Sequence, residues 1–263
     1  MNLLFVGDVV GRPGRAAVRA RLAELVNRHQ VDFTIANGEN AAGGLGLTAA
    51  TAEELLDCGV DVITTGNHVW RRRELAAFIE GERRVLRPAN FPPGAPGQGS
   101  DVFVTAHSGA VGVLCVVGRV FMEPLDCPFR AADREIEALR GRTNVIVVDV
   151  HAEATSEKIA LGRYLDGRVS AVIGTHTHVQ TADEVTLAGG TAYITDVGMT
   201  GPAESILGVT PGPVINRFLT GMPSRFQVAE GPVILNAVVV SIDTETGTAR
   251  SIVRVAELTE PES

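Results

Sequence analysis

Five short apolar runs, each ending in a cluster of polar side chains, constrain this sequence more than any other feature. The sharpest of them is the run 169–173, which leads directly into Gly174-Thr175-His176-Thr177-His178. A buried strand that ends in His-x-His sends two imidazoles out of its carboxyl end, because side chains two apart share a face. The other four runs end in the same way, in clusters that contain Asp8, Glu39-Asn40, Asn67-His68 and His151.

The first third of the chain alternates between apolar runs and segments of helical spacing. Strands are expected over 3–6, 32–36 and 60–64, and helices over 16–27, 48–56 and 71–79. Residues 11–15 carry two glycines and a proline, which predicts a turn. Thr48 suits the N-cap of its helix. This alternation predicts an α/β arrangement.

The remainder of the chain adds antiparallel strands. The runs 102–106 and 111–117 flank His107-Ser108-Gly109, which predicts a hairpin. Further elements are expected as helices over 131–139 and 155–165, the latter with a capping box at Thr155, and as strands over 144–150, 169–173, 192–194, 233–240 and 249–255. Two long segments, 87–99 and 208–226, are rich in proline and glycine and predict loops, the second as an excursion over the site. Together these elements predict a four-layer α/β/β/α sandwich of two mixed β-sheets, built from residues 1–263 as a single domain.

Charge and composition exclude several classes of protein. The formal net charge is −8, which argues against an extended nucleic-acid surface. The N-terminal apolar run 1–6 is too short for a signal peptide, and no stretch is long enough to span a bilayer. The three cysteines are widely spaced and suit a reducing compartment. We therefore expect a cytoplasmic protein without a membrane partner. A homo-oligomer is compatible with the sequence, although no apolar surface for one is visible in it.

The five polar clusters predict one shared metal site. The carboxyl ends of strands in an α/β sheet are where ligands bind. Each cluster alone has an ordinary structural explanation: Asp8 as a helix cap or turn residue, Glu39-Asn40 as a loop-stabilising pair, His151 as a strand-end histidine. Their joint placement favours a site, and the mixture of carboxylate, amide and imidazole ligands suits Mn²⁺, Fe²⁺ or Zn²⁺. Seven candidate ligands are about right for two ions that share a carboxylate.

In this order, the five clusters resemble the calcineurin-like metallophosphoesterases, and within them the YmdB-like family of bacterial proteins. The resemblance covers nearly the whole chain. It departs from the wider superfamily at Val10, where that superfamily has a histidine, and at Glu39, where it has an aspartate. The motifs that carry it are 7–15, 37–41, 65–70, 149–153 and 195–201.

The resemblance implies a role for each candidate residue. One divalent ion would be held by Asp8, Asn40 and His178, the other by Asn67, His151 and His176, and Glu39 would bridge the two. Iron or manganese is favoured, with zinc or magnesium as alternatives. His68 would be the general acid, although a supporting hydrogen-bond donor is the ordinary alternative.

The implied activity is that of a two-metal phosphodiesterase. A hydroxide generated at the ions would attack phosphorus, with 2′,3′-cyclic nucleotides the favoured small phosphodiester substrates. Arg12 or Arg15 could contact the phosphate or simply be solvated. The alternatives are a phosphomonoesterase, a nucleotide-binding regulatory module that uses the same metal site, and a metal-dependent hydrolase of amides or esters.

Overall fold

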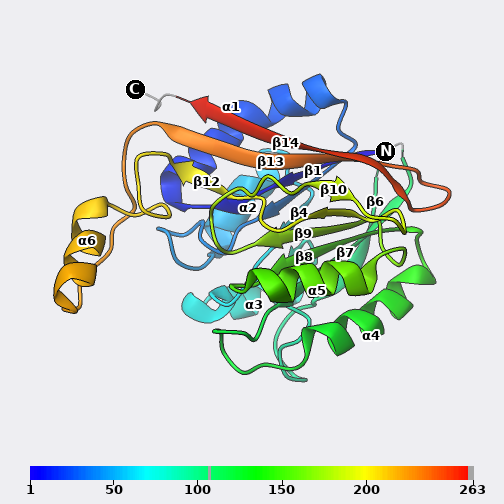
Figure 1. Ribbon diagram of the computed structural model, residues 1–263, viewed down its shortest axis with the longest axis horizontal. Helices are drawn as coiled ribbons and strands as arrows, with labels where there is room; N and C mark the ends of the chain where they lie inside the picture. Colours follow the sequence, from blue (N-terminus) through cyan, green and yellow to red (C-terminus); the bar gives the residue numbers. More distant parts are fainter. Residues whose placement is uncertain (106–107, 260–263) are drawn as a thin grey trace.

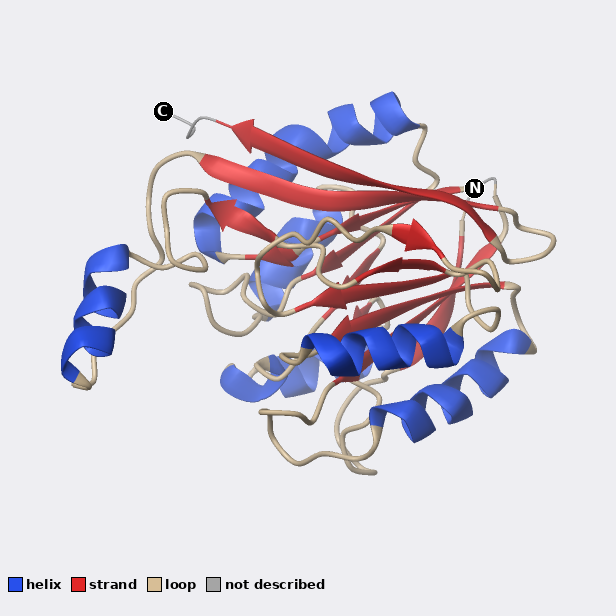
Figure 2. Cartoon of the chain, viewed as in Figure 1, coloured by secondary structure: helices blue, strands red, loops and turns tan. Residues whose placement is uncertain are grey.

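The chain forms two β-sheets packed face to face, with helices on both outer faces (Figures 1 and 2). The computed structural model describes residues 1–105 and 108–259. Ala106 and His107 of the predicted hairpin lie outside the described residues. The four-layer sandwich of two mixed sheets is therefore confirmed.

The first sheet combines parallel strands from the N-terminal third with antiparallel strands from the C-terminus. β1 pairs in parallel with β3, β3 with β4 and β4 with β5, while β13 pairs antiparallel with β1, β12 and β14. Its strands are β1 (Asn2–Val6), β2 (Asp8–Val9), β3 (Phe33–Asn37), β4 (Val62–Thr64), β5 (Val85–Leu86), β12 (Met199–Pro202), β13 (Val233–Ile242) and β14 (Ala249–Thr259).

The second sheet has a parallel centre and antiparallel edges. β7, β8, β9 and β11 run parallel, whereas β6 and β10 run antiparallel to their neighbours. The pairing of β6 with β7 confirms the predicted hairpin. The strands of this sheet are β6 (Ser100–Val104), β7 (Ala110–Val117), β8 (Val145–His151), β9 (Ala171–Thr175), β10 (Val185–Thr186) and β11 (Ala192–Ile194).

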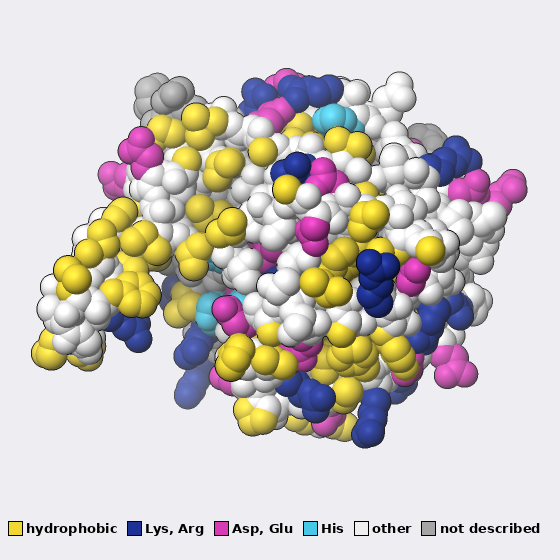
Figure 3. Space-filling model, in the orientation of Figure 1, with side chains coloured by type: hydrophobic (Ala, Val, Ile, Leu, Met, Phe, Trp, Pro, Cys, Tyr) yellow, Lys and Arg dark blue, Asp and Glu magenta, His cyan; other side chains and the backbone are white. Residues whose placement is uncertain are grey.

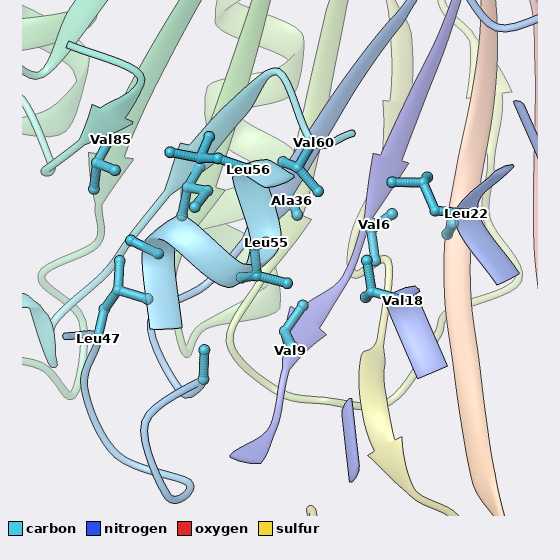
Figure 4. Close-up of a cluster of buried hydrophobic side chains, with 14 of the residues drawn as sticks. Val6, Val9, Val18, Leu22, Ala36, Leu47, Leu55, Leu56, Val60 and Val85 are labelled. Atoms are coloured by element: carbon cyan, nitrogen blue, oxygen red, sulfur yellow. The ribbon is translucent and has the colours of Figure 1, made fainter. Parts of the chain in front are cut away.

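Three apolar layers hold the four layers of structure together. The strands alternate side chains between the layers: Leu4 and Val6 face the helices, while Leu3 and Phe5 face the other sheet. Figure 4 shows the first layer, where Leu22 and Leu55 pack against the outer face of the first sheet. The helices of that face are α1 (Gly11–His29), α2 (Ala49–Asp57) and α3 (Leu75–Gly81). The outer face of the second sheet is covered by α4 (Pro128–Arg140) and α5 (Thr155–Leu165).

Local structure differs from the sequence prediction at four places. The predicted turn at 11–15 is wrong, because α1 already begins at Gly11. The helix predicted over 71–79 is divided into a short 3₁₀ turn, Val69–Arg71, and α3. Thr155 forms no capping box, because the helix is capped by Ala154 without a side-chain bond. Thr48, by contrast, caps α2 through a reciprocal pair with Thr51, as predicted.

The fourth difference lies in the segment predicted to be a loop over the site. It contains the helix α6 (Pro211–Thr220), which begins with a proline in its first turn. The helix projects away from the body of the molecule (Figures 1 and 2). Only Val214 of its residues is buried. Together with the residues on either side of it, the segment 208–226 forms an arm, defined here as residues 204–232.

Candidate metal centre

All five polar clusters meet at one edge of the molecule. They follow β1, β3 and β4 of the first sheet and β8 and β9 of the second, whose parallel strands end on the same side. The eight predicted site residues are brought together there: Asp8, Glu39, Asn40 and His151 are buried, and Asn67, His68, His176 and His178 are half-buried. The sandwich topology thus brings residues from five separate parts of the sequence into one site.

The tightest group within this cluster consists of Glu39, His151 and His176. One ligand atom from each lies within 4.8 Å of the other two. Nε2 of His151 is 3.1 Å from Glu39 Oε1 and 2.9 Å from His176 Nδ1. Asn67 adds its Oδ1, 3.1 Å from the same Nε2. Four donor atoms of three chemical types therefore surround one small volume.

A second group lies beside the first and shares Glu39 with it. Nε2 of His178 is 3.8 Å from Asp8 Oδ1 and 3.1 Å from the amide nitrogen of Asn40, which is also 3.3 Å from Glu39 Oε1. Asn40 turns its amide oxygen to His68, but a half-turn of the nearly symmetric amide exchanges the two atoms.

Two features of the backbone and side chains fit a bound cation. Asp8 Oδ1 is fully buried and accepts no hydrogen bond, which is costly for a carboxylate unless a cation is nearby. Gly66 leaves the space open: a Cβ there would lie 2.4 Å from His151 Nε2 and 2.3 Å from Glu39 Oε2. The donor set and the space therefore both fit divalent ions.

Each of the three histidines is held by its outer ring nitrogen. His151 Nδ1 lies 2.8 Å from Thr175 Oγ1, His176 Nε2 lies 3.2 Å from Glu153 Oε2, and His178 Nδ1 lies 3.0 Å from the carbonyl of Leu207. These partners are acceptors, or in the case of Thr175 a hydroxyl whose proton is used elsewhere. The outer nitrogen of each ring therefore carries a proton, which leaves the inner nitrogens as the atoms that would offer lone pairs to a bound cation. This is the arrangement by which proteins orient metal-binding imidazoles.

The hydroxyl of Thr175 connects His151 to a buried carboxylate. Thr175 Oγ1 donates to Asp149 Oδ1 at 2.7 Å, and Asp149 also accepts from Thr64 Oγ1 and Asn37 Nδ2. Burial raises the pKa of Asp149 to about 6, against the opposing charge of His151 and these hydrogen bonds. This inner network was missed from the sequence, because its members lie within apolar strands.

The charges of the site are strongly coupled. Burial lowers the pKa of His151. The carboxylates of Glu39, Asp8 and Asp149 outweigh this effect and raise the pKa to about 9. Burial raises the pKa of Asp8. The pKa of Glu39 falls well below its usual value, because the imidazoles of His151 and His68 outweigh its burial. Burial and the charge of His151 lower the pKa of His176 to about 3. Without a metal, one proton on His151 thus partly balances the buried carboxylates.

His68 lies at the rim of this cluster. Its Nδ1 is 3.0 Å from both Glu39 Oε1 and Asn40 Oδ1, and its backbone nitrogen donates to Glu39 Oε2 at 3.1 Å. Because both neighbours of Nδ1 are acceptors, this nitrogen carries a proton. The side chain is about one-fifth exposed, so its Nε2 can meet a substrate.

A pocket of about 260 Å³ opens over the cluster, and its lining includes His68, Glu153, Leu207 and Gly44. Of the two arginines considered as possible phosphate contacts, Arg15 binds Glu54 and the carbonyl of Ala41 instead. Arg12 lines a different and larger pocket, of about 620 Å³, between α1 and residues 228–233. Leu207 contributes through its backbone carbonyl, so no side-chain pattern in the sequence points to it.

Known proteins are similar to this chain over nearly its whole length. A Bacillus subtilis protein named 2′,3′-cyclic-nucleotide 2′-phosphodiesterase is 51% identical over 255 residues, which cover 97% of this chain and 96% of that protein. A solved structure of a hypothetical protein from Thermus thermophilus is 45% identical, with a TM-score of 0.92 and 99% and 100% of the chains covered. The structure of a novel phosphatase from Mycoplasma pneumoniae is 35% identical, with a TM-score of 0.92 and coverage of 99% and 94%.

The fold, the site and these relatives define the class of the protein as a hydrolase of phosphoester bonds. More narrowly, the model of the family described as YmdB-like protein matches residues 4–255, and the chain belongs to this family. The resemblance stated from the sequence motifs is therefore confirmed.

Proposed function

We propose that the protein is a two-metal phosphodiesterase that hydrolyses 2′,3′-cyclic nucleotides. The observation that carries this proposal is the arrangement of three imidazoles, each held by its outer nitrogen. The inner nitrogen of His151 lies 3.1 Å from Glu39, that of His176 lies 2.9 Å from His151, and that of His178 lies 3.8 Å from Asp8. The name of the relative from Bacillus subtilis supports the choice of substrate. Asp8, Asn40 and His178 would hold one ion and Asn67, His151 and His176 the other, with Glu39 shared.

The residues around the ions have separate tasks in this reaction. Two divalent ions at such a site neutralise the charge of a phosphoryl group and activate water as the nucleophile. Glu39 and Asp8 keep that region negative and therefore retain the ions. His68, fixed through Nδ1, would give a proton on Nε2 to the departing ester oxygen as the general acid. Manganese or iron is proposed for both ions, since the ligands are a mixture of oxygen and nitrogen.

Purified protein loaded with Mn²⁺ or Fe²⁺ and given 2′,3′-cyclic AMP tests this function. We expect ring opening to a nucleoside monophosphate. Replacement of Glu39 by Gln should lower the rate of this turnover by orders of magnitude. The matched control is Glu245→Gln, on an exposed turn at the far end of β13. Absence of turnover with both metals bound would refute the diesterase. Preferential cleavage of a phosphomonoester would favour the phosphomonoesterase instead.

We also propose one domain acting within the cytoplasm. One apolar layer, which includes Phe5 and Val147, is shared by both sheets, and this supports a single unit over residues 1–263. The described cysteines are all free, which suits a reducing compartment. Among the residues that the structure describes, no helix is long and apolar enough to cross a membrane.

We propose that a second copy of the chain covers the arm, residues 204–232. Phe218 is 84% exposed and Leu219 is 80% exposed, and Figure 3 shows hydrophobic side chains gathered over α6. Such a patch on a projecting helix is characteristic of an interaction site. The 620 Å³ groove at the base of the arm is lined in part by Ala16, Ala17 and Ala20 of α1 and in part by residues 228–231 of the arm, and could accept these side chains.

Light scattering after gel filtration tests this assembly. Phe218→Asp together with Leu219→Asp should yield monomers if the wild-type chain is a dimer or larger. Val104→Asp is the matched control, because Val104 is 84% exposed on β6, away from the arm. A wild-type monomer, or an unchanged oligomer in the double variant, would contradict the proposal.

A further inference from the structure

One motif of the sequence, residues 195–201, has no role in the metal centre as described so far. At its centre is Asp196, which is fully buried beneath the His-x-His turn. Its Oδ2 accepts hydrogen bonds from the backbone nitrogen of Thr177 at 3.0 Å and from Thr177 Oγ1 at 2.7 Å. Its Oδ1 accepts from the backbone nitrogen of Gly198 at 2.8 Å. Asp196 therefore binds Thr177, the one residue between the two histidines, through both its backbone and its side chain.

The turn that Asp196 grips has an unfavourable backbone. His176 has a φ of 97° and His178 a φ of 66°, in the left-handed region that residues with a Cβ rarely adopt. Strained conformations of this kind persist only where the surrounding contacts determine them. Without a fixed Thr177, both histidines would relax toward ordinary backbone angles and turn their rings away from the site.

The buried carboxylate of Asp196 is paired with a buried cation, the ammonium group of Lys158. Lys158, in α5, is 1% exposed, and its Nζ lies 2.7 Å from Asp196 Oδ2. A buried carboxylate needs such a partner to offset the loss of water. Gly174 makes room for the arrangement: a Cβ there would lie 1.7 Å from the carbonyl oxygen of Thr195 and 3.1 Å from Lys158 Cδ. The missing side chain lets the end of β9 approach the 195–201 segment closely.

We propose that Asp196 is a positioning residue that sets the direction of His176 and His178 together, with Lys158 compensating its charge. This inference rests on the proposed two-metal site, in which the two histidines serve different ions. Because one carboxylate holds both, its loss should weaken both ions at once. Removal of a single ligand such as His178 should weaken one ion more than the other.

The test is titration of metal-free protein with Mn²⁺ by calorimetry, using wild type and Asp196→Asn. In the variant the amide NH₂ opposes the donors of Thr177 and Lys158, while the size of the side chain is kept. We expect at least a 10-fold weaker Kd at both sites and loss of the magnetic coupling between two Mn²⁺ ions in the EPR spectrum. The matched control is Asp183→Asn, because Asp183 accepts bonds from Thr181 and Thr195 but none from the turn.

A second variant, Thr177→Val, keeps the test decisive if Asp196→Asn does not fold. It removes only the hydroxyl bond and should weaken both ions by a smaller factor. Two coupled Mn²⁺ ions bound with wild-type affinity in every variant that folds would overturn the proposal, as would an equal loss of affinity in Asp183→Asn. Failure of wild-type protein to bind two ions would instead refute the proposed function on which the inference rests.

Discussion

Replacement of Gly66 by alanine should empty the metal centre while the fold survives. The added Cβ would lie 2.2 Å from His151 Cδ2 and 2.3 Å from Glu39 Oε2, whereas ordinary contacts begin near 3.4 Å. The imidazole and the carboxylate must therefore each move by about 1 Å. Metal–ligand distances tolerate deviations of only about 0.2 Å. The methyl group would thus displace two proposed ligands of one ion.

The size of the effect follows from this displacement. A shift of about 1 Å in a reacting group costs about 100-fold in rate, or about 2.7 kcal/mol of transition-state stabilisation. The stability cost is that of an overpacked site, about 1–3 kcal/mol, which a typical domain survives. We therefore expect a folded protein with at least 100-fold lower kcat/KM and weaker Mn²⁺ binding.

The assay compares Mn²⁺ titration and turnover of 2′,3′-cyclic AMP in Gly66→Ala and Gly81→Ala. Gly81 ends α3, and a Cβ there would meet nothing within 4 Å, so it controls for the chemistry of the substitution. Circular dichroism establishes that both variants are folded. Wild-type metal affinity and activity in Gly66→Ala would refute the assignment of His151 and Glu39 to the metals.

Three further predictions concern the acid, the metals and acid stability. His68→Ala should lower kcat by about 10²–10⁴ for the cyclic nucleotide but much less for bis(p-nitrophenyl) phosphate, whose leaving group needs no proton; an equal loss on both would contradict a general acid. Chelation should abolish turnover, and Mn²⁺ at 100 times its Kd should raise the unfolding free energy by about 2.7 kcal/mol, measured by denaturant melts. Burial acts to raise the pKa of Asp101. It is outweighed by the hydrogen bonds from Val102 and Arg142 and the charge of Arg83, which hold this pKa below its usual value. Asp101→Asn should therefore cost about 1 kcal/mol at neutral pH, a difference that disappears as the pH falls through the folded pKa; a pH-independent difference would contradict this.

The sequence was sufficient for the sandwich and for the gathering of the eight site residues. Apolar runs identify strands, and parallel strands bring their carboxyl ends to one edge, so residues as distant as Asp8 and His178 become neighbours without any knowledge of the pairing. Thr48 was identified as a cap because capping depends on residues three apart. An interaction between residues this close in the sequence does not depend on how distant segments pack.

The remainder depended on contacts that no local pattern records. Asp149 and Asp196 accept hydrogen bonds from Thr175 and Thr177 beside the candidate metal centre, and only the packing of distant segments gives them these partners. The arm was expected to be a loop because Pro211, Gly212 and Pro213 obscure the helical period of α6, although a proline at the first turn is itself a signal for a helix start. Gly11 was likewise assigned to a turn because Pro13 and Gly14 follow it closely, yet it begins α1.

Diffraction from crystals soaked in Mn²⁺ is the most direct test of the two-metal site. The anomalous difference map should contain two peaks on either side of Glu39, one bound by Asp8, Asn40 and His178 and the other by Asn67, His151 and His176. A single peak, or two peaks that do not share Glu39, would contradict the account.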